Sequence, residues 1–317
     1  MNPGLLLLID LAPASLQRLE AAGYHVHRAT PAAHRAEGVA AAGAQVRAVL
    51  TNGTTGLSAA EMAQLPALEI ACALGAGYEG IDLDAAAARG IAVVNGAGTN
   101  DSTVADHAMA LLLAAVRAVP QGDVAARGSG WATSRDTRPS VSGKRLGVLG
   151  LGRIGAGIAR RGAGGFGMTV RYHNRSPVAD SPWEYCATPR ELAAASDFLV
   201  VATPGGAGTR HLVDAAVLEA LGPQGFLVNI ARGSVVDTAA LITALEAGRL
   251  AGAALDVVEG EPEVPPAMVG LRNLVLTPHM AGRSPESAAA SVGLVLDNLA
   301  AHFAGQPLRT PVLPARR

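Results

Sequence analysis

Short apolar runs alternate with alanine-rich stretches of helical length along almost the whole chain. The runs expected to be strands are Leu5–Ile9, Ala48–Thr51, Leu68–Leu74, Ala92–Asn95, Leu146–Leu149, Met168–Tyr172, Phe198–Ala202, Phe226–Ile230, Gly252–Asp256 and Leu274–Leu276. The segments expected to be helices include Pro13–Ala22, Ala59–Gln64, Asp101–Val116, Ile154–Arg161, Thr238–Glu246 and Pro285–Phe303. Because strands that alternate with helices form parallel sheets from βαβ units, the pattern predicts an α/β protein.

A length of 317 residues corresponds to about two domains. The glycine-rich segment Asn95–Gly98 precedes a long helix, and near Arg283–Pro285 the alternation gives way to one final helix. We therefore predict a central domain, residues 99–284, and an outer domain made of residues 1–98 and 285–317.

Composition excludes several classes of protein. Half of the residues are apolar and the formal net charge is −1, which argues against disorder and gives no overall basic surface for nucleic acid. Cys72 and Cys186 form neither a disulfide framework nor a zinc motif, so a reducing, cytoplasmic location is expected. Leu5–Ile9 is too short for a signal sequence or a membrane helix, so no association with a membrane is expected. His25, His27 and His34 show no metal-ligand pattern, so no metal site is expected.

A GxGxxG motif follows directly on the predicted strand Leu146–Leu149, and a predicted helix follows the motif. Gly150 permits a tight turn, Gly152 lets backbone amides approach a pyrophosphate, and Gly155 lets the helix pack on the strand. Arg153 and Ile154 lie between these glycines, at the helix N-terminus that binds phosphate. The alternative is that these glycines only form a turn, since the chain has 38 glycines.

The segment after the next strand indicates which dinucleotide binds. An NAD site places Asp or Glu there, whereas this chain has His173, Asn174, Arg175 and Ser176, with no carboxylate before Asp180. A guanidinium binds a 2′-phosphate that a carboxylate would repel. We predict that NADPH is preferred and that NAD remains possible; the alternative is an exposed polar turn.

Three polar clusters end three predicted strands and contain Arg232, Glu261 and His279. Since carboxyl ends of parallel strands converge on the ligand crevice, these side chains can meet. Arg232 would bind a substrate carboxylate, His279 would donate a proton to the carbonyl oxygen, and Glu261 would orient the imidazole and favour its charged form. Taken singly, Arg232 could be a surface arginine and His279 a turn histidine.

Three further residues are interpreted as having no catalytic role, and the role of one further segment stays open. Glu259 is expected to be solvated, His107 to pack or cap on the apolar face of its helix, and Cys72 to lie in the core. The polar region Gln121–Ser142, which contains Trp131, shows no periodicity and is expected to be a functional arm or a mobile loop.

Together, the fingerprint and the segments Asn229–Asp237, Asp256–Pro262 and Thr277–Gly282 resemble the D-isomer-specific 2-hydroxyacid dehydrogenase family. The resemblance implies two Rossmann-like doubly wound domains with an inter-domain cleft, a homodimer, and an Arg–Glu–His catalytic set. The central domain, residues 99–284, would then bind the dinucleotide, and the outer domain, residues 1–98 and 285–317, would bind the substrate. The resemblance also implies that Asp256 helps to bind the nicotinamide and that Asn52 and the amides of Ala76 and Gly77 bind the substrate, together with Arg232 and His279. The remaining predicted cofactor contacts are Val104, Thr203, Pro204 and Ala231.

Segment 173–176 is similar to that of the NADPH-using glyoxylate/hydroxypyruvate reductase branch of the family. The expected activity is hydride transfer from NADPH to a small 2-keto acid, which yields the D-2-hydroxy acid, with His279 as proton donor. Three alternatives stay open: a reductase of a larger or aromatic acid such as hydroxyphenylpyruvate, an NAD-dependent D-hydroxyacid dehydrogenase, and a dinucleotide-sensing, corepressor-like binding protein.

Overall fold

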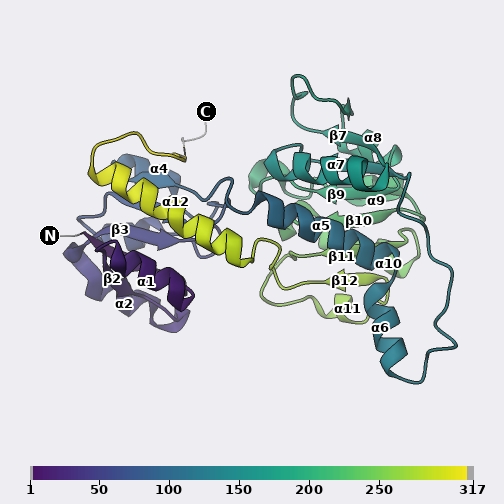
Figure 1. Cartoon of the computed structure of the whole chain (residues 1–317), viewed down its shortest axis with the longest axis horizontal. Coiled ribbons are helices and arrows are strands. Elements are labelled where there is room, and N and C mark those ends of the chain that lie inside the picture. The colour runs from purple at the N-terminus through teal and green to yellow at the C-terminus, as the bar shows by residue number, and fades with distance from the viewer. Residues whose placement is uncertain (1–2, 313–317) are drawn as a thin grey trace. The chain divides into compact units, whose positions relative to one another are not determined.

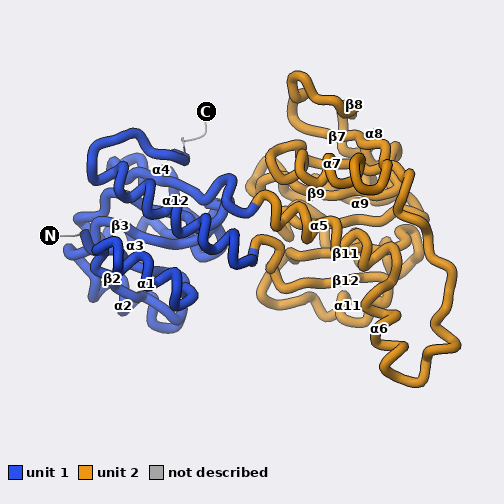
Figure 2. The backbone as a smooth tube through the Cα atoms, viewed as in Figure 1, with its two compact units in different colours: residues 1–100, 283–317 blue, residues 101–282 orange. Residues whose placement is uncertain are grey.

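The computed structural model describes residues 3–312 and divides the chain into two compact units. Unit 1 consists of residues 1–100 and 283–317, and unit 2 of residues 101–282, as Figure 2 shows in two colours. Both ends of the chain therefore contribute to unit 1. Both units contain a parallel sheet with helices, which confirms the predicted α/β class.

Unit 1 is built on a five-stranded parallel sheet with the order β2-β1-β3-β4-β5. Its strands are β1 Gly4–Leu7, β2 His25–Arg28, β3 Val46–Thr51, β4 Ile70–Ala73 and β5 Ala92–Val94. Its helices are α1 Pro13–Ala21, α2 Arg35–Ala42, α3 Ala59–Ala63, α4 Leu83–Ala88 and α12 Pro285–Phe303.

Both faces of the unit 1 sheet are covered. Leu5 and Leu7 pack with Leu19 of α1 and Leu299 of α12, whereas Leu6 packs on the opposite face with residues of α2, α3 and α4. In Figure 1 the C-terminal helix α12 lies beside the N-terminal helix α1. A strand that is buried on both faces needs a continuous apolar run, which explains the sequence of β1.

Unit 2 is built on a seven-stranded parallel sheet with the order β12-β11-β10-β9-β6-β7-β8. Its strands are β6 Arg145–Leu149, β7 Thr169–His173, β8 Glu184–Tyr185, β9 Phe198–Val201, β10 Phe226–Asn229, β11 Gly252–Leu255 and β12 Leu274–Leu276. Its helices are α5 Asp101–Val116, α6 Val119–Arg127, α7 Arg153–Phe166, α8 Pro189–Ala194, α9 Ala215–Leu221, α10 Thr238–Glu246 and α11 Pro266–Val269. The strand order reverses direction between β6 and β9, and such a switch point is where doubly wound sheets bind ligands.

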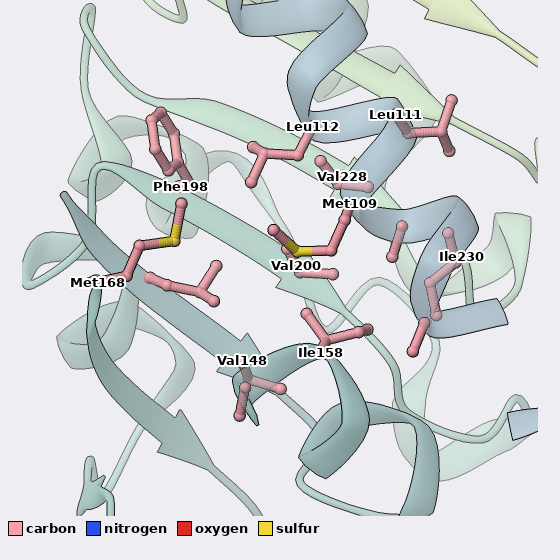
Figure 3. Packing of buried hydrophobic residues seen from close by; sticks show 14 of the residues in the cluster. Met109, Leu111, Leu112, Val148, Ile158, Met168, Phe198, Val200, Val228 and Ile230 are labelled. Atoms are coloured by element: carbon pink, nitrogen blue, oxygen red, sulfur yellow. The ribbon is translucent and has the colours of Figure 1, made fainter. Parts of the chain in front are cut away.

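The core of unit 2 lies on both faces of this sheet. On one face, Met109 and Leu112 of α5 and Ile158 of α7 pack on Val200 and Val228, as Figure 3 shows. On the other face, residues of α8, α9 and α10 cover the intervening strand side chains. This double cover holds the carboxyl ends of the strands in fixed positions.

The structure also departs from the sequence predictions. The edge strands β2 and β8 were not predicted, because exposed edge strands carry polar side chains and lack an apolar run. The strand predicted as Met168–Tyr172 is shifted by one residue to Thr169–His173. The region 121–142 is not wholly irregular, since α6 extends to Arg127.

The length and composition of the helices bear on membrane insertion. Among residues 3–312, no single helix is long and apolar enough to cross a membrane; α5 and α6 reach that length and composition only when taken together, and they are bent by 59°.

Candidate active site

The glycine-rich turn between β6 and α7 leaves no room for side chains at two of its positions. Gly150 has a φ of 100°, and a Cβ there would lie 2.8 Å from the backbone of Ala202 and Thr203. A Cβ at Gly155 would lie 2.0 Å from the carbonyl oxygen of Gly150. The turn can therefore form only with glycine at both positions.

The third glycine of the motif leaves open space. A Cβ at Gly152 would meet nothing within 4 Å, no side chain caps the N-terminus of α7, and no acidic residue lies in its first turn. The hydroxyl of Thr203 is buried and has no hydrogen-bond partner within residues 3–312. An unblocked helix N-terminus beside an orphaned hydroxyl fits the pyrophosphate of a dinucleotide.

The flanking residues of this turn take different positions. Arg153 is exposed and forms an ion pair with Asp101 at 3.2 Å, whereas Ile154 is partly buried against the core. Val104, a predicted cofactor contact, is 5% exposed and belongs to the core cluster of α5.

Segment 173–176 begins with His173, the last residue of β7. The side-chain oxygen of Asn174 accepts a hydrogen bond of 2.6 Å from the amide of Leu151, so Asn174 stabilises the glycine-rich turn. Arg175 and Ser176 are exposed. The guanidinium is thus accessible to an anion at the end of the strand where a dinucleotide's adenosine ribose binds.

The structure brings Glu261 and His279 together although they are 18 residues apart. Nδ1 of His279 lies 2.9 Å from Oε2 of Glu261, and the two side chains are 37% and 25% exposed. His279 has a φ of 49°, and its amide donates to the carbonyl of Asp256 at 2.8 Å. The imidazole is therefore held by a carboxylate on one side while part of it stays accessible.

Asp256 is the group that holds this turn. Its carboxylate is 1% exposed and accepts hydrogen bonds from the amides of Met280, at 2.9 Å, and Ala281, at 2.8 Å. The hydroxyl of Thr277 donates to the same carboxylate at 2.5 Å. The predicted contact of Asp256 with the nicotinamide stays a prediction, because the structure shows its carboxylate bonded to the His279 turn.

His107 also belongs to this network, which sequence reasoning missed. Its Nε2 lies 3.0 Å from the hydroxyl of Thr277 and 3.4 Å from the carboxylate of Asp256. His107 is therefore bonded to polar groups, a role that the expected packing or capping does not include. A polar residue on the apolar face of a buried helix was the available signal.

Arg232 follows β10, where Asn229 shapes the chain. The side chain of Asn229 accepts from the amide of Ala231 and donates to the carbonyl of Arg232, each at 3.0 Å. A Cβ at Gly233 would lie 2.1 Å from the backbone of Val258, so this loop packs against the segment that leads to Glu261. The Arg232 guanidinium is partly buried and donates to the carbonyl of Ala231 at 2.6 Å.

Glu259 is not solvated as expected. Its Oε1 lies 2.9 Å from Nε2 of His211, and its Oε2 accepts from the amide of Thr238 at 3.4 Å. Burial by itself raises the pKa of Glu259. The hydrogen bonds from Thr238 and His211 and the charge of His211 together lower the pKa by more than burial raises it, so the pKa is below its ordinary value. The error arises because two polar partners, His211 and Thr238, come from segments far along the chain, which the sequence spacing does not reveal.

Three of the predicted substrate residues, Asn52, Ala76 and Gly77, lie in loops of unit 1. The side-chain oxygen of Asn52 accepts from the amides of Thr54 and Thr55, at 3.1 and 2.6 Å, so it shapes its own loop. Ala76 and Gly77 lie in the loop after β4 and are half-buried.

A doubly wound nucleotide fold that also positions a histidine–carboxylate pair fits an α/β dehydrogenase, and the family match and the reductases to which the chain is similar define it as an oxidoreductase of this class. More specifically, the family model described as D-isomer specific 2-hydroxyacid dehydrogenase, NAD binding domain, matches residues 109–281, and the chain belongs to this family. The resemblance stated from the sequence is thereby confirmed.

Several relatives are similar over most of the chain. A glyoxylate/hydroxypyruvate reductase of Arabidopsis thaliana is 43% identical over 269 residues, which are 84% of this chain and 86% of the relative. A 2-ketogluconate reductase of Gluconobacter oxydans is 38% identical over 98% of this chain and 99% of its own. The crystal structure of an NADPH-dependent glyoxylate/hydroxypyruvate reductase from Sinorhizobium meliloti, in complex with NADP and malonate, has a TM-score of 0.90, with 40% identity over 100% of this chain and 99% of that chain.

Proposed function

We propose that this protein reduces a small 2-keto acid of the glyoxylate and hydroxypyruvate type to the D-2-hydroxy acid, with NADPH as the preferred cofactor. The observation that carries the proposal is the 2.9 Å hydrogen bond that joins His279 to Glu261 while the imidazole stays partly accessible. The names of the relatives from Arabidopsis thaliana and Sinorhizobium meliloti support the substrate class.

The pairing of His279 determines which ring nitrogen acts. Since an ionised carboxylate only accepts hydrogen bonds, Nδ1–H donates to Glu261 and Nε2–H is the group that donates to the substrate's carbonyl oxygen. The bound nicotinamide would supply the hydride. In the reverse direction the neutral Nε2 takes the proton from the hydroxyl of the D-2-hydroxy acid.

Arg232 is proposed to bind the carboxylate of the same substrate. A guanidinium presents a planar fork of N–H groups that matches a carboxylate, and the hydrogen bond to the carbonyl of Ala231 helps to direct the side chain. Asn52 and the amides of Ala76 and Gly77 are proposed as further substrate contacts. Equal affinity for a 2-keto acid and its uncharged amide would contradict this role.

The activity is tested by following NADPH oxidation with glyoxylate, hydroxypyruvate and hydroxyphenylpyruvate. We expect the highest kcat/KM with one of the two small acids. Hydroxyphenylpyruvate is included because a hydroxyphenylpyruvate reductase of Plectranthus scutellarioides is 41% identical over 84% of this chain. Tight NADPH binding without turnover of any 2-keto acid would instead support a dinucleotide-sensing binding protein.

The preference for NADPH rests on Arg175, which is exposed at the end of β7. We expect Arg175→Ala to reduce kcat/KM with NADPH by about tenfold or more, because a charge-assisted bond to the 2′-phosphate is lost, and to leave NADH nearly unaffected. Arg249→Ala, which removes another exposed arginine of unit 2, is the matched control. An unchanged NADPH/NADH ratio would show that the 2′-phosphate binds elsewhere.

A homodimer is proposed from the apolar surface of α6 and the segment that follows it. Val119, Val124 and Trp131 are 57%, 73% and 73% exposed, which is unusual for large apolar side chains. Analytical ultracentrifugation tests this state, and Trp131→Ser with Val124→Ser should shift the protein towards the monomer.

A cytoplasmic location is proposed as well, since Cys72 and Cys186 are both free and buried.

A further inference from the structure

In unit 1, the segment after β5 binds the loop after β4 through two consecutive carbonyl groups. The amide of Gly96 donates to the carbonyl of Gly75 at 2.8 Å, and Nδ2 of Asn95 donates to the carbonyl of Ala76 at 2.7 Å. A Cβ at Gly96 would lie 2.1 Å from the carbonyl oxygen of Leu74. The two segments can therefore approach this closely only with glycine at position 96.

These two bonds determine where the next amides point. In a trans peptide the N–H group is antiparallel to the carbonyl of the same unit, and both peptide units here are trans. Because the carbonyls of Gly75 and Ala76 point towards Asn95 and Gly96, the N–H groups of Ala76 and Gly77 point away from them. In the part of unit 1 that the structure describes, these two amides are bonded to no acceptor. They form a pair of adjacent donors suited to an anion.

Asn95 is itself held by the C-terminal segment, which we define as residues 304–312 after α12. The hydroxyl of Thr310 donates to the carbonyl of Asn95 at 2.6 Å, and the amide of Asn95 donates to the carbonyl of Thr310 at 3.2 Å. Asn298 of α12, which is 1% exposed, donates to the Thr310 hydroxyl at 3.1 Å. The amide of Val312 also donates to Val93 of β5 at 2.8 Å, so the segment lies along this edge strand.

We propose that Asn95 is a positioning residue for the substrate carboxylate, and that Thr310 supports it from the C-terminal segment. Asn95 holds the Ala76–Gly77 peptide so that the two amides face the carboxylate of a 2-keto acid. Gly96 contributes through its backbone. This inference rests on the proposed function, because it assigns the anion to the substrate.

The kinetic test compares Asn95→Ala with Thr310→Val, which keeps the volume of the side chain and removes only its hydroxyl. We expect KM for glyoxylate to rise about threefold to tenfold in Asn95→Ala, as for one lost hydrogen bond, and about threefold in Thr310→Val. In both variants kcat should change by less than about twofold, and the Kd for NADPH should stay at the wild-type value. Gln306→Ala, an exposed amide on the same unit, is the control and should have no effect.

A second measurement does not need turnover. Hydrogen exchange of the bonded amides of Leu74, Gly80 and Gly96 should be faster in Asn95→Ala than in wild type, because the loop is released. Unchanged exchange with unchanged KM in Asn95→Ala would overturn the proposal, and an unchanged Thr310→Val variant would overturn the part assigned to Thr310. If wild type reduces no 2-keto acid, the proposed function fails, while the exchange rates still decide whether Asn95 holds the loop.

Discussion

The substitution Asp256→Asn tests how the catalytic turn is held. The carboxylate of Asp256 accepts from the amides of Met280 and Ala281 on its two oxygens, and from the hydroxyl of Thr277. An asparagine has one acceptor oxygen and one NH2 group at the same place. Whichever way it turns, one backbone amide of the His279 turn then faces a donor in a site that is only 1% exposed.

The expected cost follows from these contacts. A hydrogen bond to a charged group contributes about 1.5–3 kcal/mol, and a buried amide without an acceptor costs about 1–3 kcal/mol. We expect Asp256→Asn to lower the free energy of unfolding of unit 2 by about 3 kcal/mol, which is about 6–12 °C in Tm for a domain of this size. A shift of about 1 Å in the imidazole would lower kcat about 100-fold.

The assay combines denaturant unfolding, kcat with the best 2-keto acid, and the Kd for NADPH. Asp214→Asn is the matched control, because Asp214 is an exposed N-cap of α9 where asparagine caps equally well, so its stability should change by less than about 0.5 kcal/mol. If Asp256→Asn were as stable as the control, the carboxylate would not be what holds the turn. A large loss of NADPH affinity with unchanged stability would instead favour the predicted nicotinamide contact.

Three further predictions follow from the described contacts. His279→Ala should lower kcat by about 100-fold or more with little change in KM, since its proton is needed in the transition state; an equal change in both constants would contradict that role. Burial raises the pKa of Cys72 to about 12, so this thiol should not react with a disulfide reagent at about pH 8 until the protein is unfolded, which a colorimetric thiol count measures. Burial by itself raises the pKa of Glu61, but the hydrogen bonds from Arg35 and Ser58 lower the pKa by more than burial raises it, so the net shift is downwards. Its stabilisation is then present above about pH 4.3 and is lost as the pH falls through the lowered pKa, so Glu61→Gln should lower Tm at pH 7 and converge with wild type in acid.

The sequence by itself determined the features that depend on neighbouring residues. The alternation of apolar runs and helices determined the α/β class, since each element must bury its apolar face. The context of Gly150–Gly155 indicated the nucleotide turn, because its steric demands lie within a few residues. The places of Arg232, Glu261 and His279 at strand ends suggested that they belong to one site.

Only the tertiary structure decided the contacts between segments far apart in the chain. His107 meets Thr277 across 170 residues, and Asn95 is held by Thr310 across 215 residues. Neither pairing leaves a pattern in the sequence, because a hydrogen bond between distant residues depends on packing geometry and not on spacing. The carboxylate of Asp256 likewise gains its partners only when β11 and β12 pair in the sheet, because this pairing brings the loop after β12 next to Asp256.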